Sequence, residues 1–183
     1  MFEPDEVGRV WLGEDSFLAP FGKYPADFRY VINYIRQPEV SKRLYHDGMD
    51  EGVYLYSTAE RLKHGVGWIG FHKGKRAAHL LLESVSHVPM VVALHGGIER
   101  ALYGTGIPQK AMEFVKHYAF NKLVADKMEG YICHPNNLLK GYFKRGGMTK
   151  ECEMRERISI KGKLYPLEVY SITSYEYEQE KEN

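Results

Sequence analysis

The feature that most constrains the fold is a strongly patterned helix that directly follows a turn with two glycines. Apolar residues recur at i, i+3, i+4, i+7 and i+8, which predicts an amphipathic helix: Ala111, Phe114, Val115, Tyr118 and Ala119. The preceding residues, 103–108, read Tyr-Gly-Thr-Gly-Ile-Pro. Glycine permits positive φ, and the first turn of a helix leaves N–H groups unpaired. The segment can therefore hold a phosphate, although an ordinary tight turn would use the same residues.

The remaining patterns predict a mixed α/β fold. A helix is expected over 25–35, and Pro38 either ends it or starts a short helix through about Tyr45. Another short helix, marked by Leu139, Tyr142 and Phe143, ends at the glycine pair 146–147. Short apolar or alternating runs predict strands at 7–12, 53–56, 67–71, 88–94, 127–133, 152–160 and 167–172. This order indicates an α/β sheet that is partly antiparallel.

Length and charge favour one domain without an affinity for polyanions. The chain has 183 residues, with 25 Lys and Arg against 24 Asp and Glu. A net charge of +1 does not favour binding to nucleic acid or anionic lipid. We expect a single domain over 1–174 and an acidic, flexible tail over 175–183. The first residues lack a signal-peptide pattern and the longest apolar stretch, 88–94, is too short for a membrane helix, so a cytoplasmic protein is expected.

The cysteine and histidine spacings do not predict a metal site. Two cysteines, Cys133 and Cys152, are too few for a disulfide scaffold or a four-thiolate zinc site. Four of the histidines are separated by 8, 7 and 8 residues, which does not place a pair on one helix face beside an acidic partner: His64, His72, His79 and His87.

Two motifs resemble those of the GCN5-related N-acetyltransferase (GNAT) superfamily. The segment 103–111 resembles the family's aromatic-Gly-x-Gly-hydrophobic-small-x-x-Ala segment. Some thirty residues later, 136–148 resembles the family's Asn-x-x-small-x-x-Leu-Tyr-x-x-x-Gly-Phe segment. The resemblance runs from about Leu94 to Met148 and is greatest to the branch that acetylates ribosomal proteins, protein N-termini and small amines.

The resemblance implies a fold and a cofactor site. The fold would be a mixed, mostly antiparallel sheet of about seven strands flanked by about four helices. The backbone of 104–106 would cradle the pyrophosphate of acetyl-CoA, and the backbone at 94–96 would pair with the pantetheine arm. Asn136 would bind that arm near its far end, and the thioester would lie where the fourth and fifth strands separate. The implied cofactor-binding residues are Leu94, His95, Gly96, Tyr103, Gly104, Thr105, Gly106, Ile107, Asn136 and Phe143.

Two departures from the family pattern bear on catalysis. Phe143 stands where many members have the Tyr that protonates the departing thiolate, and Tyr142 lies about 100° further round the helix. Pro108 removes one N–H donor from the loop. These residues leave open a second interpretation, in which the chain is a non-catalytic structural or protein-binding module of the same fold.

Transfer to an amine requires a group that removes a proton, because amines are mostly protonated at pH 7. The ionisable residues expected nearest the gap are His95, Glu99 and His134, although each could equally have a structural role. We therefore expect an acetyl-CoA-dependent N-acetyltransferase that acts by direct attack in a ternary complex. The acceptor would be a protein N-terminus, a lysine or a small amine, and the protein would act as a monomer or homodimer.

Overall fold

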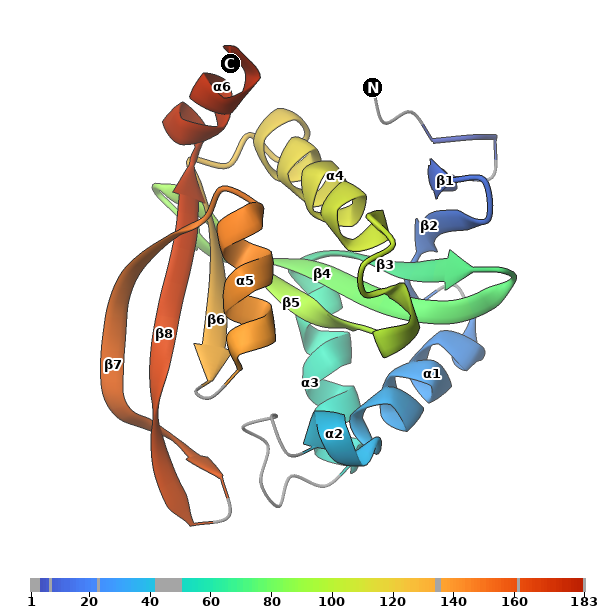
Figure 1. Ribbon diagram of the computed structural model, residues 1–183, viewed down its shortest axis with the longest axis horizontal. Helices are drawn as coiled ribbons and strands as arrows, with labels where there is room; N and C mark the ends of the chain where they lie inside the picture. Colours follow the sequence, from blue (N-terminus) through green and yellow to red (C-terminus); the bar gives the residue numbers. More distant parts are fainter. Residues whose placement is uncertain are drawn as a thin grey trace.

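The computed structural model describes residues 4–6, 8–22, 24–41, 51–133, 136–160 and 162–182, which contain one eight-stranded sheet (Figure 1). The strands are β1 (Val10–Gly13), β2 (Ser16–Pro20), β3 (Gly65–His72), β4 (Lys75–His87), β5 (Met90–Ile98), β6 (Lys127–Cys133), β7 (Thr149–Ile160) and β8 (Lys163–Thr173). Their order is β1-β2-β3-β4-β5-β6-β8-β7, and all neighbours are antiparallel except the pair β5 and β6. The mixed, mostly antiparallel sheet is confirmed, with one strand more than expected.

Helices cover both faces of the sheet. They are α1 (Pro25–Ile35), α2 (Pro38–Ser41), α3 (Glu51–Lys63), α4 (Ile107–Asn121), α5 (Asn137–Arg145), α6 (Ser174–Glu182) and the short 3-10 helix η1 (Arg100–Leu102). The helices α4 and α5 pack on one face, and α3 lies on the other (Figure 1). Within the described residues, none of these helices has the length and apolar composition needed to cross a membrane.

The amphipathic helix predicted from the apolar residues Ala111 to Ala119 is confirmed as α4, and its apolar stripe forms the centre of the core. Phe114 and Val115 are almost completely buried, in one cluster with residues of β4, β5 and β6. Trp68 on β3 packs edge-on against Phe114 and Tyr118, with ring centroids 5.0 and 4.9 Å apart. The stripe therefore anchors the first turn of α4, and the glycine loop before it, to the middle of the sheet.

The strand predicted at 53–56 is wrong, because these residues lie within α3. Four apolar or aromatic residues are too few to distinguish a strand from a helix by periodicity. The helix is set instead by residues further along, where Thr58 is buried and Leu62 packs over Gly67 of β3.

Two strands, β2 and β4, were not predicted. Residues 77–82 of β4 are buried in an unbroken run. A strand covered by helices on both faces lacks the alternation of polar and apolar residues that reveals a half-exposed strand. The short strand β2 joins β1 to β3 at the edge of the sheet.

The acidic end of the chain, expected as a flexible tail, is helical. Tyr177 of α6 is buried and stacks on Phe120 of α4, with ring centroids 4.8 Å apart. Its hydroxyl accepts a hydrogen bond from Asn121 Nδ2 at 3.2 Å, and Lys116 of α4 forms an ion pair with Glu180. One buried aromatic ring thus attaches a mostly charged segment to the core.

Candidate functional site

The two parallel strands at the centre of the sheet separate part-way along their length. β5 and β6 pair from Val91 with Lys127 to Leu94 with Gly130. Beyond that point the described strands have other partners: β5 continues to Ile98 along β4, and β6 continues to Cys133 along β8. The predicted residues Leu94, His95 and Gly96 lie on β5 at the point of separation.

The backbone of β5 beyond the separation presents hydrogen-bonding groups to the gap. Glu99 N donates to Ala77 O, on the β4 side, at 2.8 Å. Because successive residues of a strand bond alternately to either side, the N–H and C=O of Gly96 and Ile98 point the other way. The Tyr34 hydroxyl of α1 donates to Ile98 O at 3.4 Å, and its ring occupies the space that a Cβ on Gly97 would need. The edge at Gly96 is therefore available to an extended polar ligand.

The glycine loop joins the end of β5 to α4. Gly104 and Gly106 have φ of +78° and +77°, and a Cβ at either position would meet no heavy atom within 4 Å. Thr105 Oγ1 holds the loop from within, donating to Leu102 O at 2.7 Å and accepting from Ile107 N at 3.3 Å. Gly106 is the N-cap residue of α4 and has no side chain to satisfy the amides of the first turn. The loop therefore turns open backbone and the positive end of a helix toward solvent, as an anion site requires.

The second motif lies across the gap on α5. Asn136 caps this helix, because its Oδ1 accepts a hydrogen bond from Leu139 N at 3.2 Å, and the cap does not use its amide nitrogen. Phe143 is 3% exposed, and its ring lies directly over Gly130, where a Cβ could not fit. Phe143 therefore forms an apolar wall at the point where the strands separate.

Tyr142 connects the two motifs. Its hydroxyl donates to Pro108 O at 2.8 Å, which ties α5 to the first turn of α4. Burial raises the pKa of this phenol well above its ordinary value. Tyr142 is thus a structural link between the two helices.

His95 lies in a network of charged groups on the α3 face of the sheet. Its Nε2 is 2.9 Å from Oε2 of Glu83, although the angle is not that of a hydrogen bond, and Arg61 Nε of α3 is 3.3 Å from the same oxygen. Burial, followed by the positive charge of Arg61, lowers the pKa of His95 to about 4. The ring is therefore neutral at pH 7, and the same shift makes it a weaker base than a free imidazole. The sequence analysis did not select Glu83, because its position beside His95 depends on the register between β4 and β5.

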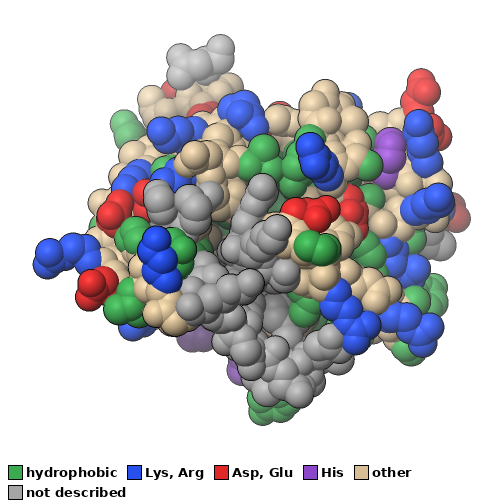
Figure 2. All heavy atoms as spheres, turned by 60° about the horizontal axis from the view of Figure 1, so that its bottom comes forward, with side chains coloured by type: hydrophobic (Ala, Val, Ile, Leu, Met, Phe, Trp, Pro, Cys, Tyr) green, Lys and Arg blue, Asp and Glu red, His purple; other side chains and the backbone are tan. Residues whose placement is uncertain are grey.

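The other two candidate bases have different surroundings. Glu99 accepts from Gln37 Nε2 with both carboxylate oxygens, at 3.0 and 3.2 Å, and is thus held at the end of α1. His134 lies outside the described residues. Figure 2 shows a cluster of Asp and Glu side chains right of the centre of the face turned toward the viewer, with Lys and Arg side chains above and below it.

A buried histidine that sequence reasoning did not select lies beside the end of β5. His79 of β4 is 3% exposed, and the rings of Tyr30 and Tyr34 pack edge-on against it with centroids 6.2 and 5.1 Å away. Burial lowers the pKa of His79 to about 4. Burial, and then the charge of Glu99, raises the pKa of Tyr30. This cluster packs α1 against β4.

A hollow of about 340 Å³ lies between α4, α5 and α6. Its lining combines cations with carboxylates and belongs to Gln109, Met112, Glu113, Lys116, Tyr142, Arg145, Gly146 and Glu180. In the part of the chain that the structure describes, no group of three or more His, Cys, Asp or Glu side chains is placed to hold a metal ion.

Comparison with known proteins identifies the fold. No protein-family model and no curated protein sequence matches the chain. Among solved structures, a probable GNAT-family acetyltransferase from Chromobacterium violaceum matches with a TM-score of 0.76 at 16% identity, covering 96% of this chain and 91% of that one. The chain has the GNAT fold.

Two further structures with this fold contain coenzyme A. Spermidine N-acetyltransferase from Vibrio cholerae, in complex with CoA and spermine, has a TM-score of 0.75 at 14% identity and covers 90% of this chain and 99% of its own. A ribosomal L7/L12 α-N-protein acetyltransferase in complex with CoA has a TM-score of 0.72 at 11% identity, covering 90% and 97%. The GNAT fold that the two motifs implied is thereby confirmed, while the branch within the superfamily stays a prediction.

Proposed function

We propose that the protein is an acetyl-CoA-dependent N-acetyltransferase that transfers an acetyl group directly to a primary amine. The observation that carries this proposal is that the gap beside β6 and the glycine loop both lie at the end of β5. β5 leaves its parallel neighbour after Leu94 and, a few residues later, leads into a glycine loop at the start of α4. A gap with an open strand edge suits an extended amide-containing arm, and a helix start suits the pyrophosphate at its end. The GNAT-fold structures in complex with CoA support the same cofactor.

The residues present fit acetyl-CoA. Gly104 to Ile107 would hold the pyrophosphate with backbone groups, and Tyr103 would flank it. The edge at 94–96, together with Asn136 Nδ2, would bind the pantetheine arm, and Phe143 would line the gap beside the thioester. Acetyl-CoA supplies an activated acyl group, and an N–H on the open edge of β5 would stabilise the oxyanion formed on attack.

Side chains of this protein would remove the proton from the acceptor amine. His95, with Glu83 beside it, is a candidate for removing the first proton, which converts the ammonium form of the acceptor to the neutral amine before attack. Glu99 and His134 stay candidates for the same role or for attracting a cationic acceptor. The acceptor is a primary amine, either of a protein or of a small molecule, as in the two named neighbours.

One observation favours a second candidate function. Phe143 occupies the position of the family's acid, and the adjacent Tyr142 hydroxyl is engaged by Pro108 O. A GNAT-fold module that binds a partner without catalysing transfer would accommodate both features.

Calorimetry and a thiol-release assay separate these functions. We expect the protein to bind acetyl-CoA and to release CoA thiol with at least one amine of a panel of spermidine, Nα-blocked lysine and a peptide with a free N-terminus. Binding without thiol release from any of these amines would favour the non-catalytic module. A folded protein that does not bind acetyl-CoA at millimolar concentration would refute the proposal.

A further inference from the structure

Each of the two separating strands carries a side chain that can transfer protons, on the same face of the sheet. His95 and Tyr131 are the first residues after the last β5–β6 pair, Leu94 with Gly130. Side chains of a strand alternate between faces, so His95 shares a face with Ala93, and Tyr131 shares one with Glu129. Ala93 and Glu129 are paired across the two strands and hence lie on the same face. His95 of β5 and Tyr131 of β6 therefore lie on one face of the sheet, each at the first position beyond the paired segment.

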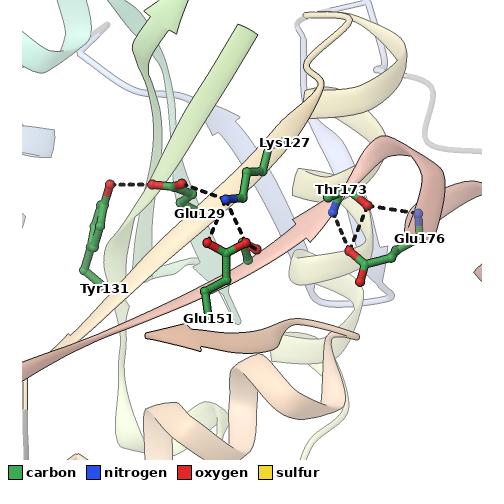
Figure 3. Close-up of polar contacts among 7 residues, drawn as sticks. Lys127, Glu129, Tyr131, Glu151, Thr173 and Glu176 are labelled. Atoms are coloured by element: carbon green, nitrogen blue, oxygen red, sulfur yellow. Dashed lines mark hydrogen bonds and ion pairs between the residues drawn. The ribbon is translucent and has the colours of Figure 1, made fainter. Parts of the chain in front are cut away.

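The phenol of Tyr131 is hydrogen-bonded to a carboxylate that is itself held on both sides. Tyr131 donates to Glu129 Oε2 at 2.7 Å, and Lys127 Nζ lies 3.2 Å from Oε1 of the same carboxylate (Figure 3). Lys127 also donates to Glu151 of β7 at 2.7 Å, and Glu151 accepts from Ser171 of β8 at 2.7 Å. Side chains from β6, β7 and β8 thus hold the Glu129 carboxylate in the orientation in which it accepts the hydrogen bond of the phenol.

The hydrogen bonds of Lys127 keep a positive charge beside Glu129. Burial alone would lower the pKa of Lys127, but its hydrogen bonds to Glu151 and Glu129 outweigh burial and raise it. Lys127 is accordingly charged throughout the neutral range and stabilises the carboxylate next to it. A phenol bonded to a carboxylate can accept a proton on its oxygen while it passes its own proton on.

We propose that Tyr131, with Glu129 behind it, is the proton carrier of the transfer reaction and does the work for which Phe143 has no proton. This inference rests on the proposed acetyltransferase function. The neutral amine nitrogen attacks the thioester carbonyl carbon with its lone pair. An N–H proton of the adduct moves to the Tyr131 oxygen as the phenol proton moves to Glu129 Oε2. The C–S bond then breaks with its electron pair on sulfur, and the proton returns through Tyr131 to the thiolate, which gives the amide, CoA thiol and the original Tyr131–Glu129 pair.

The assignment makes Tyr131 a catalytic residue and Glu129 a positioning residue. Removing the phenol oxygen should affect the chemical step without affecting the loop that holds the cofactor. General acid–base groups contribute about 10²- to 10⁴-fold to rate. We therefore expect Tyr131→Phe to lower kcat by about 100-fold or more and to leave the Kd for acetyl-CoA within about twofold. Glu129→Gln, which keeps the phenol and changes its acceptor, should lower kcat by about tenfold.

The experiment compares Tyr131→Phe and Glu129→Gln with Tyr175→Phe, whose ring is 73% exposed on α6. Each variant is measured by acetyl-CoA calorimetry, by thermal unfolding, and by thiol release from the panel amines in H₂O and D₂O. A solvent isotope effect on kcat that is present in the wild type and altered in Tyr131→Phe would support proton transfer, because a merely structural residue would not change it.

The outcomes separate the two proposals. If the kcat of Tyr131→Phe is within threefold of the wild-type value, the role of Tyr131 as proton carrier is refuted and the acetyltransferase function stands. If the wild type binds acetyl-CoA but acetylates none of the amines, both proposals are refuted. If Tyr131→Phe does not fold, Glu129→Gln decides, and an unchanged kcat in that variant refutes the role of the pair.

Discussion

The most direct test of the cofactor site is the addition of one methyl group at Gly104. This residue has φ of +78°, and a Cβ built on it would meet no heavy atom within 4 Å. Gly104→Ala therefore causes no clash in the folded protein. Its cost is the left-handed backbone, about 1–2 kcal/mol for a residue with a Cβ. In a chain of this size, each kcal/mol lowers Tm by about 2–4 °C, so the variant should remain folded at 25 °C.

The effect on binding should exceed the effect on stability. The new methyl group projects into the space from which a phosphate would approach the loop backbone. A charge-assisted hydrogen bond is worth about 1.5–3 kcal/mol, and 1.4 kcal/mol corresponds to a factor of ten in Kd. Losing one such bond raises the Kd for acetyl-CoA by about 10- to 100-fold.

A matched glycine elsewhere in the chain controls for backbone strain. Gly74, in the turn between β3 and β4, has φ of +74° and equally no heavy atom within 4 Å of a Cβ. Gly74→Ala should lower Tm by a similar amount and leave acetyl-CoA affinity unchanged when both are measured by thermal unfolding and calorimetry. An affinity of Gly104→Ala within twofold of the wild type would refute the placement of the pyrophosphate. An equal loss of affinity in both variants would attribute the effect to general destabilisation.

Three further predictions concern the fold around the site. Gly130→Ala would drive a Cβ into the ring of Phe143, and we expect a loss of about 1–3 kcal/mol in urea unfolding; an unchanged midpoint would contradict the close contact. Tyr177→Ala should cost about 3 kcal/mol, because it removes a buried ring from the α6–α4 contact, whereas Tyr175→Ala at an exposed position should cost under 0.5 kcal/mol; equal midpoints in urea for these two variants would show that α6 does not contribute. The pKa of His79 is about 4 in the folded protein against 6.5 in the unfolded chain. Between these pH values the unfolded chain binds more protons than the folded protein. The contribution of the neutral His79 to the free energy of unfolding is therefore lost as the pH falls from 6.5 to 4. His79→Phe should remove about 3 kcal/mol of this acid dependence in urea midpoints measured from pH 7 to 4, and an unchanged pH dependence would contradict a neutral buried imidazole.

Parts of the fold could be predicted because their signals are local. The helix at 107–121 and the glycine loop before it depend on residues within one or two turns of each other. The failed prediction at 53–56 shows the limit of the same approach, because four residues carry too little periodicity. The missed strand over 75–87 shows another limit, because burial on both faces removes alternation.

The candidate site divides in the same way. The family resemblance predicted Leu94 to Gly96 as part of the cofactor site, and the glycine pattern predicted a loop able to hold an anion. Glu83 was missed because its proximity to His95 depends on the register between β4 and β5. Tyr131 and Glu129 are two residues apart in a predicted strand, so alternation could have put them on one face.

The sequence by itself determined a helix with one apolar face, a loop able to hold an anion and the family resemblance built on both. Tertiary structure alone decided that β5 and β6 separate after Leu94 and Gly130, that Phe143 closes that point with an apolar ring, and that His95 and Tyr131 share the opposite face. The physical reason is that local conformation follows from neighbouring residues. Strand register and the surroundings of a side chain depend on contacts between segments that are distant in the chain and meet only when the whole sheet has formed.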